Sequence, residues 1–178
     1  NQARNLRKSY AETSSKFYAE YDTNMKDLRS AAGKLSGTDF QLDKSDIRAN
    51  ADGSKSYSDK LKTAIESVKD LVNEYNETSD FLRENKSLGK GVQQLTTEFS
   101  DTTYKADSYA KMGITVDAKT GKMSVNESRL ARALTDSPAQ SEAILGKGGL
   151  AGRADRHAQY AQMARSRVIP SMQQAIGG

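Results

Sequence analysis

The sequence predicts a mainly α fold: an elongated antiparallel helical bundle or coiled coil, with a small β-hairpin and short helices at one end. Apolar residues recur at helical spacing along two long segments of similar length, and the other helix faces are polar. The composition has 35% apolar and 28% charged residues, no Trp and two Pro, which is typical of long amphipathic helices. At 178 residues the chain suits one domain, or one elongated domain with a tail.

The first long helix is predicted over residues 3–35, and a polar connection follows over residues 36–56. Apolar residues spaced by three, four and seven form one stripe along this helix: Tyr10, Phe17, Tyr21, Met25, Leu28, Ala32 and Leu35. In the connection, Phe40 and Leu42 are expected to anchor the chain to the bundle. Asp43–Ser56 is rich in Asp, Asn, Ser and Gly, which predicts an exposed loop.

The second long helix is predicted from about Tyr57 to Asn85, with Ser54 or Ser56 as its cap. Its narrow stripe contains Leu61, Ile65, Val68, Val72, Tyr75 and Leu82. Two helices with such stripes predict an antiparallel coiled-coil hairpin. We expect the following residues to form its seam: Tyr10, Phe17, Tyr21, Leu28, Leu35, Leu61, Val68, Val72, Tyr75 and Leu82.

A third helix is predicted over about Gly91–Lys111, and a β-hairpin near residues 114–125. The apolar stripe of the helix contains Val92, Leu95, Phe99, Thr103, Ala106 and Tyr109. Alternating apolar residues mark the two strands of the hairpin: Ile114 and Val116, then Met123 and Val125.

Turn and cap residues predict how the hairpin continues into short helices. Gly121 is free to take a positive φ in the turn. Asn126 is a good N-cap for a helix over Glu127–Leu134. A further short helix, Ala139–Leu145, follows with Pro138 at its first position.

The glycine-rich residues 146–149 end that helix, and a last helix is predicted over about Leu150–Ala175, kinked or ended by Pro170. Its stripe has few large apolar residues: Leu150, Ala154, His157, Ala161, Ala164 and Val168. We therefore expect this helix to pack loosely or to need a partner. The chain divides accordingly into a domain of residues 1–145 and a C-terminal helix within residues 146–178.

No catalytic, cofactor or metal site is predicted. The chain has no Cys, and its one histidine, His157, is interpreted as a surface or packing residue. The run Gly146-Lys147-Gly148-Gly149 lacks the spacing of a nucleotide-phosphate loop and is interpreted as a helix break. An enzyme is therefore the least expected class.

The net charge of +4 is dispersed along the chain, which is typical of solvated helix surfaces and makes nucleic-acid binding a distant alternative. The same interpretation applies to the arginines of the last helix. No apolar run approaches the roughly 18 residues of a membrane span, so no membrane insertion is expected. The chain begins at Asn1 without Met and shows no signal peptide, so we expect a trimmed start and leave export without a cleaved signal open.

Four stretches carry a more specific signal in their order: Glu74-Tyr75-Asn76, Met112-Gly113-Ile114, Thr120–Val125, and Leu130–Leu134 with Pro138. Together they resemble the C-terminal half of the flagellar filament-capping protein family, also called hook-associated protein 2. The similarity covers roughly residues 65–153. Its hairpin and cap motif contains Gly113, Ile114, Gly121, Val125, Asn126, Leu130 and Leu134.

The resemblance implies a secreted structural protein that oligomerises at the tip of the flagellum and helps flagellin to fold into the filament. In that family long helices form legs, and a large β-rich insertion between the first two helices forms a plate. Here only residues 37–56 separate those helices, so the plate is missing and adhesion cannot be carried over. We favour the leg domain of a reduced family member over a related bundle with another task.

The expected partners are flagellin or hook-junction subunits, and the full-length protein is expected to form a homo-oligomer. The expected location is extracellular, on the bacterial flagellum. The competing hypothesis is a cytoplasmic helical protein-binding module, either a regulator or a secretion chaperone, and flagellar neighbours in the genome would favour the first hypothesis over it.

Overall fold

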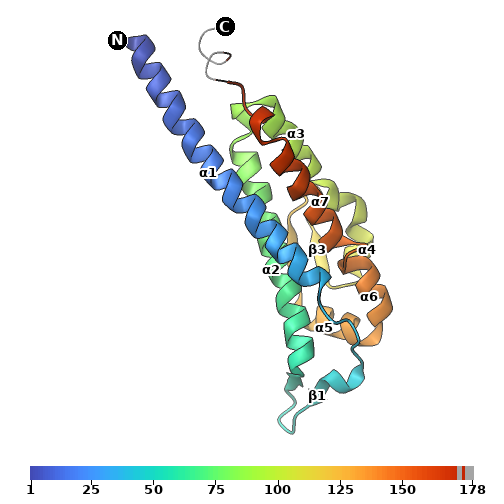
Figure 1. The fold of residues 1–178 in the computed structure, drawn as a ribbon. Coiled ribbons are helices and arrows are strands. Elements are labelled where there is room, and N and C mark those ends of the chain that lie inside the picture. Colours follow the sequence, from blue (N-terminus) through green and yellow to red (C-terminus); the bar gives the residue numbers. More distant parts are fainter. Residues whose placement is uncertain (172–173, 175–178) are drawn as a thin grey trace.

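The computed structural model describes residues 1–171 and Gln174, and it confirms the predicted fold class (Figure 1). The molecule is an elongated, mainly α bundle. Helix α1 (Gln2–Ser36) runs along most of its length, while α2 (Asp59–Glu84) and α7 (Leu150–Met163) run beside it in the opposite direction.

The seam between α1 and α2 is a run of large apolar side chains. Phe17 stacks on Phe81 with the ring centroids 5.2 Å apart, and Leu28 is fully buried. All of the predicted seam residues are buried except Tyr10, which is half-buried and donates its hydroxyl to the carbonyl of Pro170. Tyr75 is buried as well, and its ring packs on Phe99.

The first part of α1 extends past the rest of the bundle at the end where the N-terminus lies (Figure 1). Residues 1–9 are all exposed, and Leu6 keeps 55% of its surface accessible. Asn1 caps the helix by accepting a hydrogen bond from the backbone N–H of Arg4. This projecting part therefore has a capped end but little packing.

The connection between α1 and α2 contains a second hairpin. Residues 43–56 are largely exposed, as predicted, but the prediction that they form a loop was wrong. Strand β1 (Ile47–Ala49) pairs antiparallel with β2 (Lys55–Tyr57), after the short helix η1 (Lys44–Asp46). These strands are largely exposed and lack alternating apolar residues, so the sequence carries no strand pattern there. The two expected anchors, Phe40 and Leu42, are buried.

Ser58 begins α2, in place of the predicted Ser54 or Ser56. Its hydroxyl accepts from the N–H of Leu61 and donates to the carboxylate of Asp46 in η1. The β1–β2 pairing thus delays the start of the helix to Asp59.

The predicted third helix is three separate pieces, so the expectation of one continuous helix was wrong. After η2 (Lys86–Leu88) come α3 (Lys90–Glu98), η3 (Asp101–Lys105) and α4 (Ala106–Ala110). The break turns Thr102, rather than Thr103, into the core, where its hydroxyl donates to the carbonyl of Gly121.

The hairpin and the short helices after it follow the prediction. Strand β3 (Ile114–Val116) pairs antiparallel with β4 (Met123–Val125), and Ile114 lies opposite Val125. Helix α5 (Glu127–Asp136) follows at once, and α6 (Pro138–Leu145) begins with its proline.

Helix α7 is well packed, so the expectation of loose packing was wrong for the part of the chain that can be judged. Ala154, Ala158 and Ala161 are fully buried, and the hydroxyl of Tyr21 in α1 donates to the carbonyl of Ala161. Small side chains let two helix backbones approach closely, which compensates for the lack of large apolar residues.

The last helix also ends earlier than predicted. Helix α7 stops at Met163 and is followed by η4 (Arg165–Arg167), ahead of Pro170. The predicted end at Ala175 lies outside the described residues. One continuous cluster of buried apolar residues extends from Phe17 to Ile169, so α7 shares the core of the bundle.

Candidate functional site: the helix–hairpin junction

Asn76 fastens α2 to the β3–β4 hairpin. Its side-chain Nδ2 donates to the carbonyl of Met123 at 2.8 Å, and its Oδ1 accepts from the N–H of Met123 at 2.9 Å. One amide side chain thus satisfies both backbone polar groups of Met123, as a neighbouring strand would. Since β4 pairs with β3 alone among the described residues, this contact occupies its open edge.

Tyr75, the preceding residue, connects the same helix to η3 and α7. Its hydroxyl donates to Oδ1 of Asp101 at 3.0 Å, and its ring lies 5.2 Å from that of Phe99. The other carboxylate oxygen of Asp101 accepts from Nη1 of Arg153 at 3.1 Å and lies 2.8 Å from Nε2 of His157. Side chains from α2 and α7 therefore meet at one carboxylate of η3.

The surroundings hold Asp101 in its charged form. Burial favours the neutral acid, but the hydrogen bonds from His157, Arg153 and Tyr75 outweigh it and lower the pKa of Asp101. Burial and the nearby Asp101 raise the pKa of Tyr75, so its phenol remains a donor. His157 bonds to Asp101, so the cluster joins side chains of α2, η3 and α7.

Two glycines let the hairpin fit tightly against its neighbours. Gly113 has a φ of +72°, and a Cβ there would lie 2.8 Å from the Cβ of Arg129 and 2.9 Å from the backbone nitrogen of Leu130. Gly121 has a φ of +77°, and its carbonyl accepts from the buried hydroxyl of Thr102 at 2.6 Å. Any other residue would be strained at a positive φ and would also collide.

Asn126 connects the hairpin to α5. Its Oδ1 accepts from the N–H of Arg129 at 3.0 Å, and its own N–H donates to the carbonyl of Gly113 at 2.8 Å. The predicted cap therefore also closes the hairpin. We call the following set the helix–hairpin junction: Tyr75, Asn76, Gly113, Ile114, Gly121, Met123, Val125, Asn126, Leu130 and Leu134. Among them Ile114, Leu130 and Leu134 are buried and Val125 is half-buried.

Sequence reasoning missed the groups that complete this junction. The sequence does not indicate Asp101 and Thr102, because both lie in the segment predicted as a regular helix and neither belongs to its apolar stripe. The sequence predicts a solvated face for Arg153, yet Arg153 pairs with Asp101. One signal did exist: His157 falls within the apolar stripe of its helix, and a polar side chain at a core position needs a partner.

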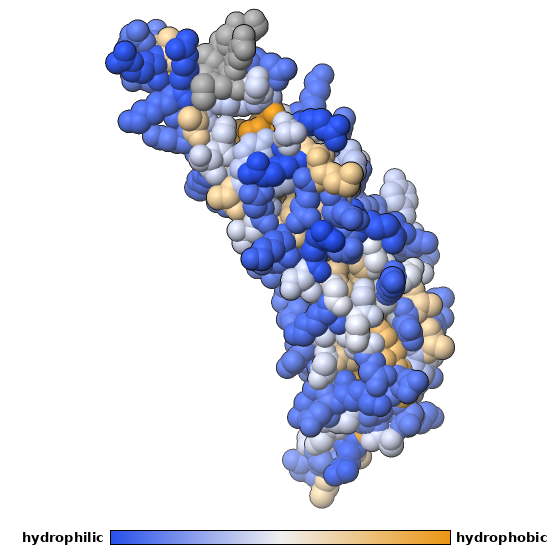
Figure 2. Space-filling model, viewed as in Figure 1, coloured by the Kyte–Doolittle hydropathy of each residue, from blue (hydrophilic) through white to orange (hydrophobic). Residues whose placement is uncertain are grey.

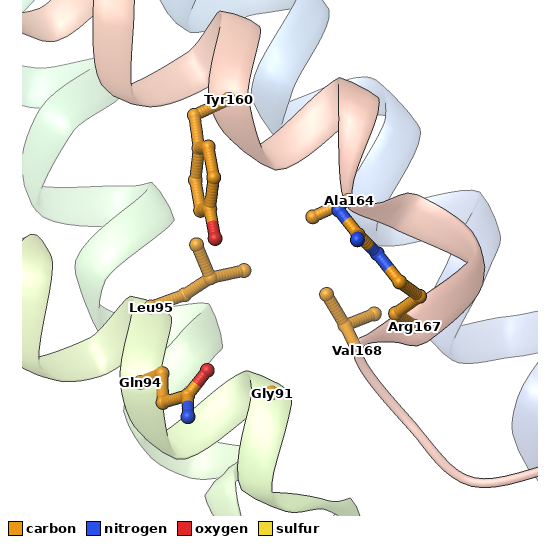
Figure 3. A pocket seen from close by; sticks show the side chains of 7 residues that line it. All are labelled: Gly91, Gln94, Leu95, Tyr160, Ala164, Arg167 and Val168. Carbon is orange, nitrogen blue, oxygen red and sulfur yellow. The ribbon is translucent and has the colours of Figure 1, made fainter.

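The face of the bundle seen in Figure 2 is mostly hydrophilic. Tyr160 and Met163 on α7 are two of its exposed large apolar residues. Tyr160 borders a groove of about 210 Å³ between α3 and α7, together with the apolar Leu95 and Val168 and the cationic Arg167 (Figure 3). This groove is a candidate contact surface because Tyr and Arg are enriched at protein interfaces.

Residues 1–171 and Gln174 contain no group of three or more His, Cys, Asp or Glu side chains placed to hold a metal ion. Within the same residues, no helix combines the length and the apolar character needed to cross a membrane. Comparisons with protein families, with characterised proteins and with solved structures find no match for this chain.

Proposed function

We propose that this chain is a structural assembly protein of the bacterial flagellum, which acts on flagellin or hook-junction subunits as a filament cap does. The helix–hairpin junction is the observation that carries the proposal. The stretches that resemble the filament-cap family are separated in sequence, yet they contact each other through the two Asn76–Met123 hydrogen bonds and the Ile114–Val125 strand pairing. Contact between them supports an interpretation as one structural unit rather than as unrelated short matches.

The shape of α1 supports a role in assembly. Residues 1–9 extend past the bundle and are exposed, so this end of the helix lacks the tertiary packing that supplies most helical stability in proteins. Leu6 and Tyr10 continue the apolar stripe of the buried seam into this part. We infer that this part packs on a second copy of the chain, so that the full-length protein is a homo-oligomer. We also propose that the protein is located outside the cell and has no enzymatic activity.

The test begins with deletion of the gene. We expect monomeric flagellin to leak into the culture supernatant and filaments to be short or absent, and we expect the wild-type gene to restore both filaments and swimming. Antibody against this chain should detect it in the supernatant or on filaments. Normal filaments and motility in the deletion strain would overturn the proposal, and the helical binding module would then be the hypothesis to pursue.

A surface variant sharpens the test without affecting the core. Tyr160→Ser combined with Met163→Ser changes two exposed residues of α7, and Tyr104→Ser changes an exposed tyrosine outside the groove. If the α3–α7 groove contacts flagellar subunits, the double variant should leak flagellin while the Tyr104 variant restores filaments. Equal melting temperatures of the purified variants would show that a folding defect does not cause the leakage of flagellin.

A further inference from the structure

A small cavity lies where the end of η3 and α4 meet the loop between α6 and α7. Its volume is about 140 Å³. Three parts of the chain contribute polar groups to its lining: Lys105 and Ser108 with Tyr109, the loop glycines Gly148 and Gly149, and Arg153 in the first turn of α7. It lies apart from the α3–α7 groove and shares only Arg153 with the cluster around Asp101.

The lining is electropositive for two independent reasons. Lys105 forms no ion pair among the described residues. Arg153 pairs with Asp101 through Nη1, which leaves its other guanidinium N–H groups free to donate. Helix α7 also begins at this point. Gly149 at its N-cap provides no side-chain cap and the first turn contains no acidic residue, so only the carbonyl of Gly146, which accepts from the N–H groups of Gly149 and Gly152, offsets the positive end of the helix dipole.

Tyr109 adds a neutral hydrogen-bond donor to the cavity. Only 2% of its surface is accessible, its side chain lines the cavity, and its hydroxyl has no hydrogen-bond partner in residues 1–171 and 174. Burial raises the pKa of Tyr109, so the hydroxyl stays protonated and acts as a donor at neutral pH. The hydroxyl oxygen itself is not sealed from solvent, so it is free to donate to a ligand in the cavity.

We propose that this cavity binds a phosphate group, either free or carried by a small phosphate ester. Lys105 and Arg153 supply the charge, the hydroxyls of Ser108 and Tyr109 supply neutral donors, and the start of α7, which has no acidic residue in its first turn, adds its dipole. Gly148 contributes no side chain to the space, and a Cβ there would meet nothing within 4 Å. The proposal stands independently of the flagellar role.

The experiment is a titration of the ¹⁵N-labelled chain with inorganic phosphate, at constant ionic strength maintained with chloride. We expect saturable shifts of the amide signals of Gly148, Gly149 and Leu150. Tyr109→Phe removes only the hydroxyl, and Lys105→Gln removes an exposed charge. Each should weaken phosphate binding on the order of tenfold, since a hydrogen bond to a charged group is worth about 1.5–3 kcal/mol.

Matched variants separate this site from general surface charge. Tyr104→Phe and Lys62→Gln alter an exposed tyrosine and an exposed lysine that do not line the cavity, and they should leave the affinity unchanged. Glycerol 3-phosphate should shift the same amides, and tighter binding than phosphate would identify an ester as the ligand. Shifts that do not saturate, equal weakening by all four variants, or acetate binding as tightly as phosphate would each overturn the proposal.

Discussion

Helix α2 is held on two sides by different kinds of contact. Towards α1 it uses a seam of interlocking apolar side chains, with Leu28, Val68 and Val72 almost fully buried. Towards the hairpin it uses single polar groups, above all the amide of Asn76. The seam gains stability from area removed from water and tolerates small shifts, whereas the junction depends on atoms placed within hydrogen-bond distance. The difference predicts which substitutions each side tolerates.

The largest effect is expected in the seam. Leu28→Ala should lower the free energy of unfolding by about 2–4 kcal/mol, because it removes buried apolar surface and leaves a cavity. The matched control is Leu6→Ala in the projecting part of the same helix, where a change within about 0.5 kcal/mol is expected. Chemical denaturation measures both, and equal losses for the two variants would contradict the difference in packing between the two parts of α1.

Within the junction, the largest loss of stability is expected from substitution of a glycine with a positive φ. Gly113→Ala should cost about 1–3 kcal/mol, because Gly113 has a positive φ and a Cβ would press on Arg129 and Leu130. Gly33→Ala is the opposite case, since nothing lies within 4 Å of a Cβ there and alanine favours the helix by up to about 1 kcal/mol. Melting temperatures that shift in the same direction for both variants would contradict the strain expected at Gly113.

The sequence predicts the elements that apolar stripes hold together better than those that single polar contacts hold together. The stripes of α1 and α2, and the alternation of Ile114 and Val116, are periodic, and periodic patterns reveal the buried face directly. Asn126 as the N-cap of α5 and Pro138 as the first residue of α6 are local signals, and both lie where predicted. The break after Glu98 was not predictable, because it depends on Asp101 and Thr102 meeting partners far away in sequence.

Two further elements escaped prediction for related reasons. The strands β1 and β2 are short, exposed and without alternation, so only their mutual pairing defines them. The tight packing of α7 comes from alanines such as Ala154 and Ala158, whose small size gives a weak apolar signal but permits close approach to α1. Within the candidate site, the sequence indicated Tyr75 and Asn76, while their partner atoms required the structure.

A smaller effect is expected at Asn76. Asn76→Ala should lower the free energy of unfolding by about 1–2 kcal/mol, because it leaves the N–H and carbonyl of Met123 without their partner. Asn73→Ala replaces an exposed asparagine three residues earlier on the same helix and should have little effect. Hydrogen exchange at the Met123 amide is the sharper measurement: it should accelerate in the Asn76 variant alone, and unchanged protection would show that Asn76 does not hold β4.

The smallest effect concerns acid stability and the carboxylate of Asp101. Its pKa is lower in the folded chain than in the unfolded chain, because the hydrogen bonds from His157, Arg153 and Tyr75 outweigh burial. The stability that Asp101 contributes is therefore complete above the unfolded pKa of about 3.9 and is lost as the pH falls through the folded value.

The Asp101→Asn variant should accordingly unfold more easily at neutral pH, and its deficit in free energy of unfolding relative to the wild type should shrink as the pH falls below about 4. Denaturation curves at several pH values measure this convergence, with Asp59→Asn, an exposed carboxylate at the start of α2, as the control. A deficit that stays constant down to acid pH would mean that the charge of Asp101 does not hold α2, η3 and α7 together, and that the joint depends on packing as the seam does.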